Sequence, residues 1–290
     1  MNPPLYPDFK PLGLEDQDLV KRYLDAHPSG VCEMNFPNLL IWKDSERPRY
    51  TILNGNLCLL VEPTFEPAYF LPPAGGNEVE KTIKTCLTHA PRLSRVPEAY
   101  VEKYGSAFRV EEDRDNFDYV YLGEELAELK GKKFDGKRNR IKKFESSFDH
   151  AYVELRREHS DDCRRLLLQW FEEKGNGDPY MKAEKDAILE ALEDFEMLGL
   201  TGRVVTVAGR VEAFTFGMRL TDDTALIQIE IANPAFPGLA QWINREFVRR
   251  EWSAFRFINR EQDMGVPGLR TAKLSYQPDH LVKKFNLYKE

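Results

Sequence analysis

Residues 203–231 read RVVTVAGRVEAFTFGMRLTDDTALIQIEI, and β-branched and aromatic side chains dominate this stretch. It is interrupted twice, by Gly209-Arg210 and by Asp222-Asp223, which are residue types that favour turns. The stretch therefore predicts three strands over 203–208, 211–220 and 224–231. Because the connections between them are short, we expect neighbouring strands to run antiparallel.

Helices and strands are predicted on both sides of this stretch. In chain order they are a strand over 150–155, helices over 161–173 and 181–198, and then, after the three strands, a helix over 239–251, a strand over 253–258, a short helix over 269–274 and a strand over 281–288. Strand, two helices, three antiparallel strands, helix, strand, helix, strand is the element order of a GCN5-related acyltransferase (GNAT) domain.

The first half of the chain also mixes helices and strands, and its clearest element is a hairpin of 50–53 and 57–61 around Asn54-Gly55. The halves share an order of elements but no residue-level repeat. We therefore predict a mixed α/β (α+β) fold of tandem GNAT-like domains. The expected parts are an N-terminal domain over 1–122, a basic connecting helix over 123–149 and a C-terminal domain over 150–290 that carries the active site.

The composition is that of a globular protein. Of 290 residues, 42% are hydrophobic and 31% are charged, and the net charge is −7. No segment reaches the eighteen or so consecutive apolar residues that a membrane helix needs, and the N-terminus lacks the pattern of a signal peptide, so we expect a cytoplasmic protein without a transmembrane segment. The four cysteines form no CxxC pair and the five histidines show no ligand spacing, so no metal site is expected.

The most unusual composition lies in residues 130–145, KGKKFDGKRNRIKKFE. Eight basic residues stand against two acidic ones, which gives a local charge of +6 in an acidic chain. Phe134, Ile141, Phe144 and Phe148 recur at helical spacing, which predicts a helix that docks through these residues and presents a basic face. Such a face suits RNA phosphates, with Lys137, Arg138 and Lys142 as contacts, or anionic lipid headgroups; it is also compatible with a solvated connecting helix.

A second candidate site surrounds Glu230. This residue and Gln228 share one face of the strand predicted over 224–231, whose other face is apolar. A carboxylate is costly in so apolar a strand unless it is paired or exposed in a cleft, so Glu230 is a candidate general base; alternatively it lies at an exposed edge or in a salt bridge within the sheet. The start of the following helix, at Gly238 and Leu239, offers backbone N–H groups for a phosphate or an oxyanion.

A third candidate is the loop NREQDMGVPGLRTAKLSY over 259–276. It combines Arg260, Arg270 and Lys273 with Glu261 and Asp263 between a strand and a short helix. Loops at strand ends carry function in α/β folds, although the charges of this loop are also compatible with internal ion pairs. No pattern specifies a serine or cysteine nucleophile, a P-loop or a dinucleotide fingerprint.

Three segments, YLGEELAELKGKKFDGKRNRIKKF, QIEIANPAFPGLAQWIN and FINREQDMGVPGLRTAKLSYQPDHLVKKF, resemble the catalytic domain of the phosphatidylglycerol lysyltransferase family. The resemblance implies tandem GNAT-like domains, related in fold to the Fem-type peptidyltransferases, that transfer an aminoacyl group from aminoacyl-tRNA. It also implies roles for three sets of residues: the basic stretch Lys137, Arg138 and Asn139, the strand carboxylate Glu230, and the C-terminal motif Asn259, Arg260, Glu261, Asp263, Arg270 and Lys273.

Together these features predict an aminoacyl or acyl transferase that works by direct transfer. The donor is aminoacyl-tRNA or, alternatively, a coenzyme A thioester, and no covalently bound cofactor is expected. An activated ester needs only placement, a base and oxyanion donors, which Glu230, the helix start at Leu239 and Arg260 or Lys273 would supply. The acceptor would be an anionic lipid headgroup or a small amine. The alternative from another class is a non-catalytic module that binds RNA or lipid, and the oligomeric state stays open.

Overall fold

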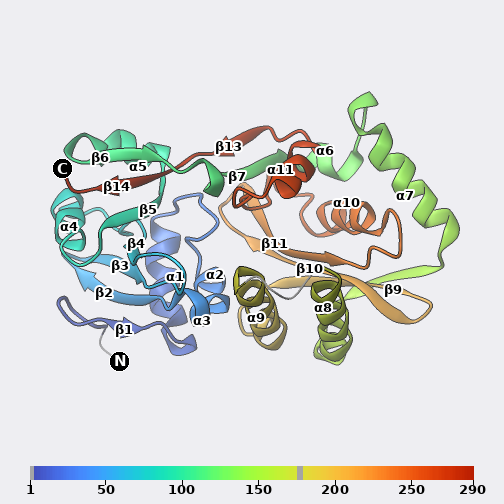
Figure 1. Ribbon diagram of the computed structural model, residues 1–290, viewed down its shortest axis with the longest axis horizontal. Helices are drawn as coiled ribbons and strands as arrows, with labels where there is room; N and C mark the ends of the chain where they lie inside the picture. The colour runs from blue at the N-terminus through green and yellow to red at the C-terminus, as the bar shows by residue number, and fades with distance from the viewer. Residues whose placement is uncertain (1–2, 175–178) are drawn as a thin grey trace. The chain divides into compact units, whose positions relative to one another are not determined.

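The computed structural model describes residues 3–174 and 179–290, and within them the strands form two seven-stranded mixed sheets (Figure 1). The chain divides into two compact units. The first contains Met1–Asp118, Gln262–Pro267 and Leu281–Glu290, and the second contains Tyr119–Glu261 and Gly268–His280. The mixed α/β class predicted from the sequence is confirmed.

The sheet of the first unit pairs β4 with β5 in parallel, and its other ladders are antiparallel. The predicted hairpin joins β2 to β3 through Asn54 and Gly55, whose φ angles are both positive, as the tight hairpin turn requires. In sheet order the strands are β1 (Lys10–Pro11), β2 (Arg49–Leu53), β3 (Asn56–Val61), β4 (Tyr69–Phe70), β5 (Arg92–Pro97), β14 (Lys284–Tyr288) and β6 (Arg109–Glu112). The helices of this unit are α1 (Gln17–Ala26), α2 (Phe36–Ile41), α3 (Lys43–Glu46), α4 (Val79–Cys86) and α5 (Glu98–Tyr104).

The second sheet contains the three antiparallel strands predicted over 203–231, which are β9, β10 and β11. The last of them, β11, also pairs in parallel with β12. Its strands are β8 (His150–Glu154), β9 (Thr201–Val207), β10 (Arg210–Arg219), β11 (Thr224–Ala232), β12 (Phe257–Asn259), β7 (Asp118–Leu122) and β13 (His280–Val282). The remaining helices are α6 (Gly123–Glu128), α7 (Asp135–Ser147), α8 (Ser160–Lys174), α9 (Pro179–Asp194), α10 (Leu239–Glu251) and α11 (Pro267–Leu274). In the described part of the chain, none of these helices combines the length and the apolar character needed to cross a bilayer.

The two sheets have the same strand order, with one strand exchanged between them. Each sheet has four strands in antiparallel succession, then a parallel partner, then a strand from the other half of the chain, then a last strand. β14, drawn in red, lies among the blue and green strands of the first sheet, and β7, drawn in green, lies among the orange strands of the second (Figure 1). The compact units therefore differ from the expected parts 1–122, 123–149 and 150–290: the C-terminal strand belongs to the first unit and the basic helix to the second.

The basic helix docks through its apolar residues, as the spacing predicts. Ile141 and Phe144 of α7 are buried, and the ring of Phe144 lies 5.9 Å from that of Trp242 on α10. The two helices approach closely at Gly238, which precedes α10 and has a φ angle of 99°. A Cβ atom built on Gly238 would lie 2.1 Å from the carbonyl oxygen of Arg140. Only glycine fits at this position without displacing α7.

Replacement of Gly238 by Ala is therefore expected to lower the free energy of unfolding by at least about 1–2 kcal/mol, because the positive φ angle and the Arg140 carbonyl both oppose a side chain. Chemical denaturation measures this difference. The matched control is Gly136→Ala within α7, where an added Cβ meets no neighbouring atom. That change should leave the stability unchanged or raise it by up to about 1 kcal/mol. Equal stability of the two variants would contradict the close packing at Gly238.

Candidate functional site

Two parallel strands of the second sheet separate where Glu230 lies. β11 pairs with β12 over three residues only, whereas its pairing with β10 continues to the end of the strand. A β-bulge in the β10–β11 ladder leaves Gln228 without a cross-strand partner. Bulges redirect side chains and are common beside active sites. Gln228 and Glu230 thus lie beyond the end of β12, on the half-buried face that strand alternation predicts.

Glu230 accepts hydrogen bonds from two elements. Its Oε2 accepts from Nδ2 of Asn244 on α10 at 2.8 Å, and its Oε1 accepts from Nη2 of Arg260, which follows β12, at 3.3 Å. The side chains of Glu230 and Arg260 are each only 16% exposed. Each carboxylate oxygen retains a lone pair that can accept a proton from a further donor.

Two tyrosines surround the guanidinium of Arg260. Its Cζ lies 4.8 Å from the ring centroid of Tyr276 and 5.8 Å from that of Tyr121. Burial alone would lower the pKa of Arg260, but attraction to Glu230 and to the tyrosines outweighs it, and the pKa is raised. Burial, opposed by Arg260, raises the pKa of Tyr276 to about 12, so its phenol is neutral at pH 7. Arg260 is therefore a buried, fixed cation between Glu230 and two tyrosine rings.

Three side chains around Glu230 have unused hydrogen-bonding capacity. Nη1 of Arg260, Oδ1 of Asn244 and both polar side-chain atoms of Gln228 are buried without a partner among the described residues. Buried polar groups are almost always hydrogen-bonded, so a concentration of unpaired ones calls for an explanation. Donors and acceptors are both present, which suits a small polar ligand.

Lys273 lies close to this group but its ammonium is engaged by the backbone. Its Nζ donates to the carbonyl oxygen of Arg260 and, at 3.1 Å, to that of Glu261. The hydroxyl of Tyr121 in turn donates to the carbonyl oxygen of Lys273 at 2.9 Å. The geometry fits a residue that fixes the position of Arg260 rather than one that contacts substrate.

The other residues of the C-terminal motif shape the backbone around Arg260. Oδ1 of Asn259 accepts from the N–H of Glu261 at 2.8 Å, and Glu261 has a φ angle of 57°. Asp263 accepts from the N–H of Gly265 at 2.9 Å and from Arg114 at 3.3 Å; these three residues belong to the first unit. Arg270 is half-buried on α11, in the second unit.

The basic residues of the segment 130–145 differ in how they are bound. Arg138 pairs with Asp135 and donates to two backbone carbonyls, one of them that of Gly131 at 2.7 Å, so it closes the turn before α7. Lys137 donates to Oγ of Ser275 at 2.8 Å. Four further residues are exposed on α7, and their side chains form no hydrogen bond or ion pair with the described residues: Asn139, Arg140, Lys142 and Lys143.

At the start of α10 the backbone N–H of Leu239, one of the two donors expected there, is already engaged. The N–H of Leu239 already donates to the carbonyl of Phe236 at 3.1 Å, and Gly238 and Leu239 are both buried. Asn244, by contrast, was not singled out by the sequence analysis. It follows Trp242 and Ile243 among the buried residues of α10. A polar residue on the otherwise apolar face of this helix is the sequence feature that could have identified Asn244, because a buried amide needs hydrogen-bond partners.

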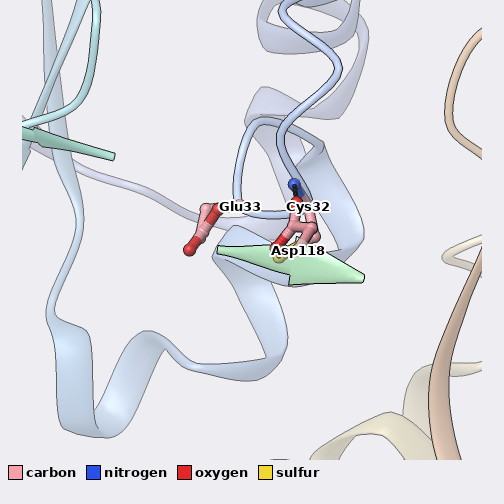
Figure 2. A group of neighbouring side chains, drawn as sticks. All are labelled: Cys32, Glu33 and Asp118. Atoms are coloured by element: carbon pink, nitrogen blue, oxygen red, sulfur yellow. Dashed lines mark hydrogen bonds between the residues drawn. The ribbon is translucent and has the colours of Figure 1, made fainter. Parts of the chain in front are cut away.

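A separate cluster in the first unit contains three residues of types that can bind a metal ion. Ligand atoms of Cys32, Glu33 and Asp118 lie within 4.8 Å of one another (Figure 2). The fully buried Lys284 places its Nζ 2.6 Å from Asp118, 2.6 and 2.8 Å from the two oxygens of Glu33, and 3.6 Å from the sulfur of Cys32. The lysine ammonium thus supplies the positive charge among these ligands, and we assign the cluster to a buried ion-pair network.

A surface hollow of about 900 Å³ in the second unit also lies away from Glu230. Charges of both signs line it, and the two most buried of them, Arg203 and Glu251, already form a bidentate ion pair at 2.7 and 2.8 Å. Its two most buried charged groups are therefore satisfied by each other, unlike the polar atoms around Glu230.

Comparison with solved structures shows the fold over nearly the whole chain. A conserved protein of unknown function from Bacteroides thetaiotaomicron is 29% identical, with a TM-score of 0.88 over 97% of this chain and 99% of its own. L-PGS from Bacillus licheniformis is 15% identical, with a TM-score of 0.64 over 94% and 92% of the two chains. FemX is 9% identical, with a TM-score of 0.56 over 96% of each.

No curated protein sequence matches the chain. The family model described as phosphatidylglycerol lysyltransferase, C-terminal, matches residues 25–288, which confirms the resemblance found in the sequence. Family and fold together support an aminoacyl or acyl transferase of this type. On this match over nearly its entire length, the chain belongs to the phosphatidylglycerol lysyltransferase C-terminal family.

Proposed function

We propose that the protein transfers an aminoacyl group directly from aminoacyl-tRNA to an amine or hydroxyl acceptor, with Glu230 as general base. The observation that carries the proposal is the carboxylate of Glu230 between Asn244 and Arg260, beside buried polar atoms without partners, at the point where β11 and β12 separate. The side chains that contact Glu230 are those of Asn244 and Arg260, and neither is a nucleophile, which agrees with transfer that does not pass through the enzyme.

The chemistry requires few groups because an aminoacyl ester is already activated. The acceptor amine or hydroxyl attacks the ester carbonyl and gives its proton to Glu230. The negative charge that develops on the carbonyl oxygen is stabilised by a fixed donor, for which Nη1 of Arg260 is buried and unpaired. As the intermediate collapses, the C–O ester bond breaks and the departing ribose hydroxyl takes the proton back from Glu230.

The polynucleotide donor is favoured over coenzyme A by two features. The exposed cations of α7, Arg140, Lys142 and Lys143, have no carboxylate partner in the described part of the chain, so they are free to meet phosphates. At the start of α10, where a pyrophosphate would bind to N–H groups, Gly238 and Leu239 are buried and the Leu239 N–H already donates to the carbonyl of Phe236. The acceptor would be an anionic lipid headgroup or a small amine.

A transfer assay tests the reaction itself. The protein is incubated in turn with tRNA carrying a labelled amino acid and with labelled acetyl-coenzyme A, each with a lipid extract and with a mixture of small amines. We expect the label to leave tRNA in an enzyme-dependent manner. Transfer from coenzyme A alone would favour the N-acyltransferase, and salt-sensitive RNA binding without any transfer would favour a non-catalytic binding module.

Replacement of Glu230 by Gln is expected to lower the transfer rate by about 10²- to 10⁴-fold, because the amide keeps the shape of the side chain but cannot take the proton. The rate is measured under single-turnover conditions. A suitable control is Glu251→Gln, because Glu251 is 14% exposed and is likewise paired with an arginine, Arg203. Both variants lose an ion pair, but only the first should lose turnover. A Glu230→Gln variant that is less stable yet transfers at the wild-type rate would make the carboxylate structural.

Replacement of Arg140, Lys142 and Lys143 together by Gln is expected to make tRNA binding less sensitive to salt. The slope of log affinity against log salt should fall by roughly two to three, since each lost phosphate contact releases one counterion fewer. Binding is measured by filter retention between low and physiological salt. A triple replacement of the exposed Lys84, Lys103 and Lys283, all in the first unit, serves as the control and should leave the slope unchanged. Equal slopes in the two triple variants would exclude α7 as the RNA contact.

A further inference from the structure

Cations from two parts of the second unit, α7 and the loop after β12, gather around the ring of Tyr276, which follows α11. The ammonium of Lys137 on α7 lies 3.5 Å from the ring centroid, and the guanidinium of Arg260 lies 4.8 Å from it. Arg140 is three residues after Lys137, so the two side chains are neighbours on one face of α7. The only carboxylate described among these groups is Glu230, which is bound to Arg260.

The ammonium of Lys137 lacks a counter-ion. Its hydrogen-bond acceptor is the neutral hydroxyl of Ser275, and across residues 3–174 and 179–290 no carboxylate lies within salt-bridge distance of it. Other cations of the same segment are neutralised: Lys133 pairs with Glu125 at 2.8 Å, and Arg138 pairs with Asp135. Burial, together with repulsion from Arg260 and Arg140, lowers the pKa of Lys137 to about 8.

A half-buried lysine held among like charges is costly, and an anionic ligand would remove that cost. Lysine binds phosphate as a compact point charge with three donors, and a neighbouring arginine adds planar ones. The exposed Lys142 and Lys143 continue the positive face of α7 beyond Arg140, so a chain of phosphates can approach along the helix.

We propose that Lys137 and Arg140 form a subsite for a phosphate group of the donor, immediately beside the Glu230–Arg260 pair. The identity of the donor rests on the proposed function, whereas the subsite itself is defined by phosphate chemistry. The subsite places the phosphorylated end of a donor at α7 and its acyl carbonyl at Arg260. The ammonium form of Lys137 is the binding form, so affinity for phosphate is highest below pH 8 and decreases as the pH rises through this value.

Binding of 5′-phosphorylated CCA trinucleotide, measured by calorimetry from pH 7 to pH 9.5, tests the subsite. The terminal phosphate has a second pKa near 6, so it is mostly dianionic at pH 7 and its charge changes little above pH 8, where the decrease in affinity is measured. The titratable and charged groups that face Lys137 are Arg140, Arg260 and Tyr276. The pKa of Arg260 is raised above its ordinary value and that of Tyr276 is raised to about 12, so neither of these two groups titrates between these pH values. We expect the affinity of the wild-type protein to fall by up to tenfold per pH unit above pH 8.

Three variants separate the role of charge from that of structure. Lys137→Gln should weaken binding at pH 7 about tenfold or more and abolish its pH dependence, whereas Lys137→Arg should retain binding at pH 9.5 because its charge does not titrate. The matched control is Lys133→Gln, since Lys133 also lies over an aromatic ring, that of Phe134 at 5.0 Å, but is paired with Glu125. Affinity in this control should change less than twofold.

Coenzyme A and short-chain phosphatidylglycerol, used in place of the trinucleotide, identify the source of the phosphate. Loss of affinity in Lys137→Gln with only the trinucleotide or only coenzyme A assigns the subsite to that donor, whereas loss with phosphatidylglycerol alone would overturn its assignment to the donor. Wild-type binding that is independent of pH, or equal binding by Lys137→Gln and Lys133→Gln, would overturn the subsite. The transfer assay is independent of these results: a confirmed subsite with no aminoacyl transfer would refute the proposed function alone.

Discussion

The exchange of one strand between the two sheets is the constraint on which the candidate site depends. β7 comes from the first half of the chain, yet it is the strand that holds the loop after β12. The N–H of Arg260 donates to the carbonyl of Tyr119 at 2.9 Å, and the N–H of Tyr119 donates to the carbonyl of Glu261 at 3.1 Å. Tyr121, two residues further on, binds the backbone of Lys273. The backbone of the only arginine that contacts Glu230 among the described residues is therefore fixed by a segment about 140 positions away in the chain. An arginine on a free loop would spend little time in one geometry, because ordering such a side chain carries an entropic cost.

The repeated topology also allows the two units to be compared at equivalent strands. β5 and β12 hold the same place in their sheets, and each brings an arginine to the point where the parallel pair separates. In the first unit the three guanidinium nitrogens of Arg95 face Glu33, Asp113 and Glu66, at 3.3, 2.9 and 3.8 Å. In the second unit Arg260 has one carboxylate partner, and its Nη1 is unpaired, among the residues that the structure describes. The first arginine is satisfied within the protein and stabilises it, whereas the second retains capacity for a ligand. This difference, rather than the fold, is the reason why the proposed chemistry is assigned to the second unit.

Much of the fold and part of the site were predictable from the sequence, for identifiable reasons. The strands over 203–231, the Asn54-Gly55 hairpin and the docking of α7 through Phe144 follow from local patterns, and the structure confirms each of them. Strand exchange leaves no local signal, because β7 and β14 have ordinary strand sequences whichever sheet they join. The partners of Glu230 depend on that topology, so Asn244 and Tyr276 could not be assigned to it. For the same reason Lys273, a cation in the right loop, gave no sign that its ammonium binds the carbonyls of Arg260 and Glu261. Residue type identifies the candidate residues, but only the folded structure shows which of their polar atoms lack a hydrogen-bond partner.

The most direct measurement is a crystal structure of the protein with an aminoacyl-adenosine analogue in which an amide replaces the reactive ester. The ligand should lie where β11 and β12 separate, with its carbonyl oxygen about 3 Å from Nη1 of Arg260 and its reactive face toward Glu230. The buried atoms of Gln228 and Asn244 that now lack partners should acquire them. A ligand bound instead in the hollow beside Arg203 and Glu251, or a complex in which Arg260 and Gln228 keep their unpaired atoms, would contradict acyl transfer at Glu230.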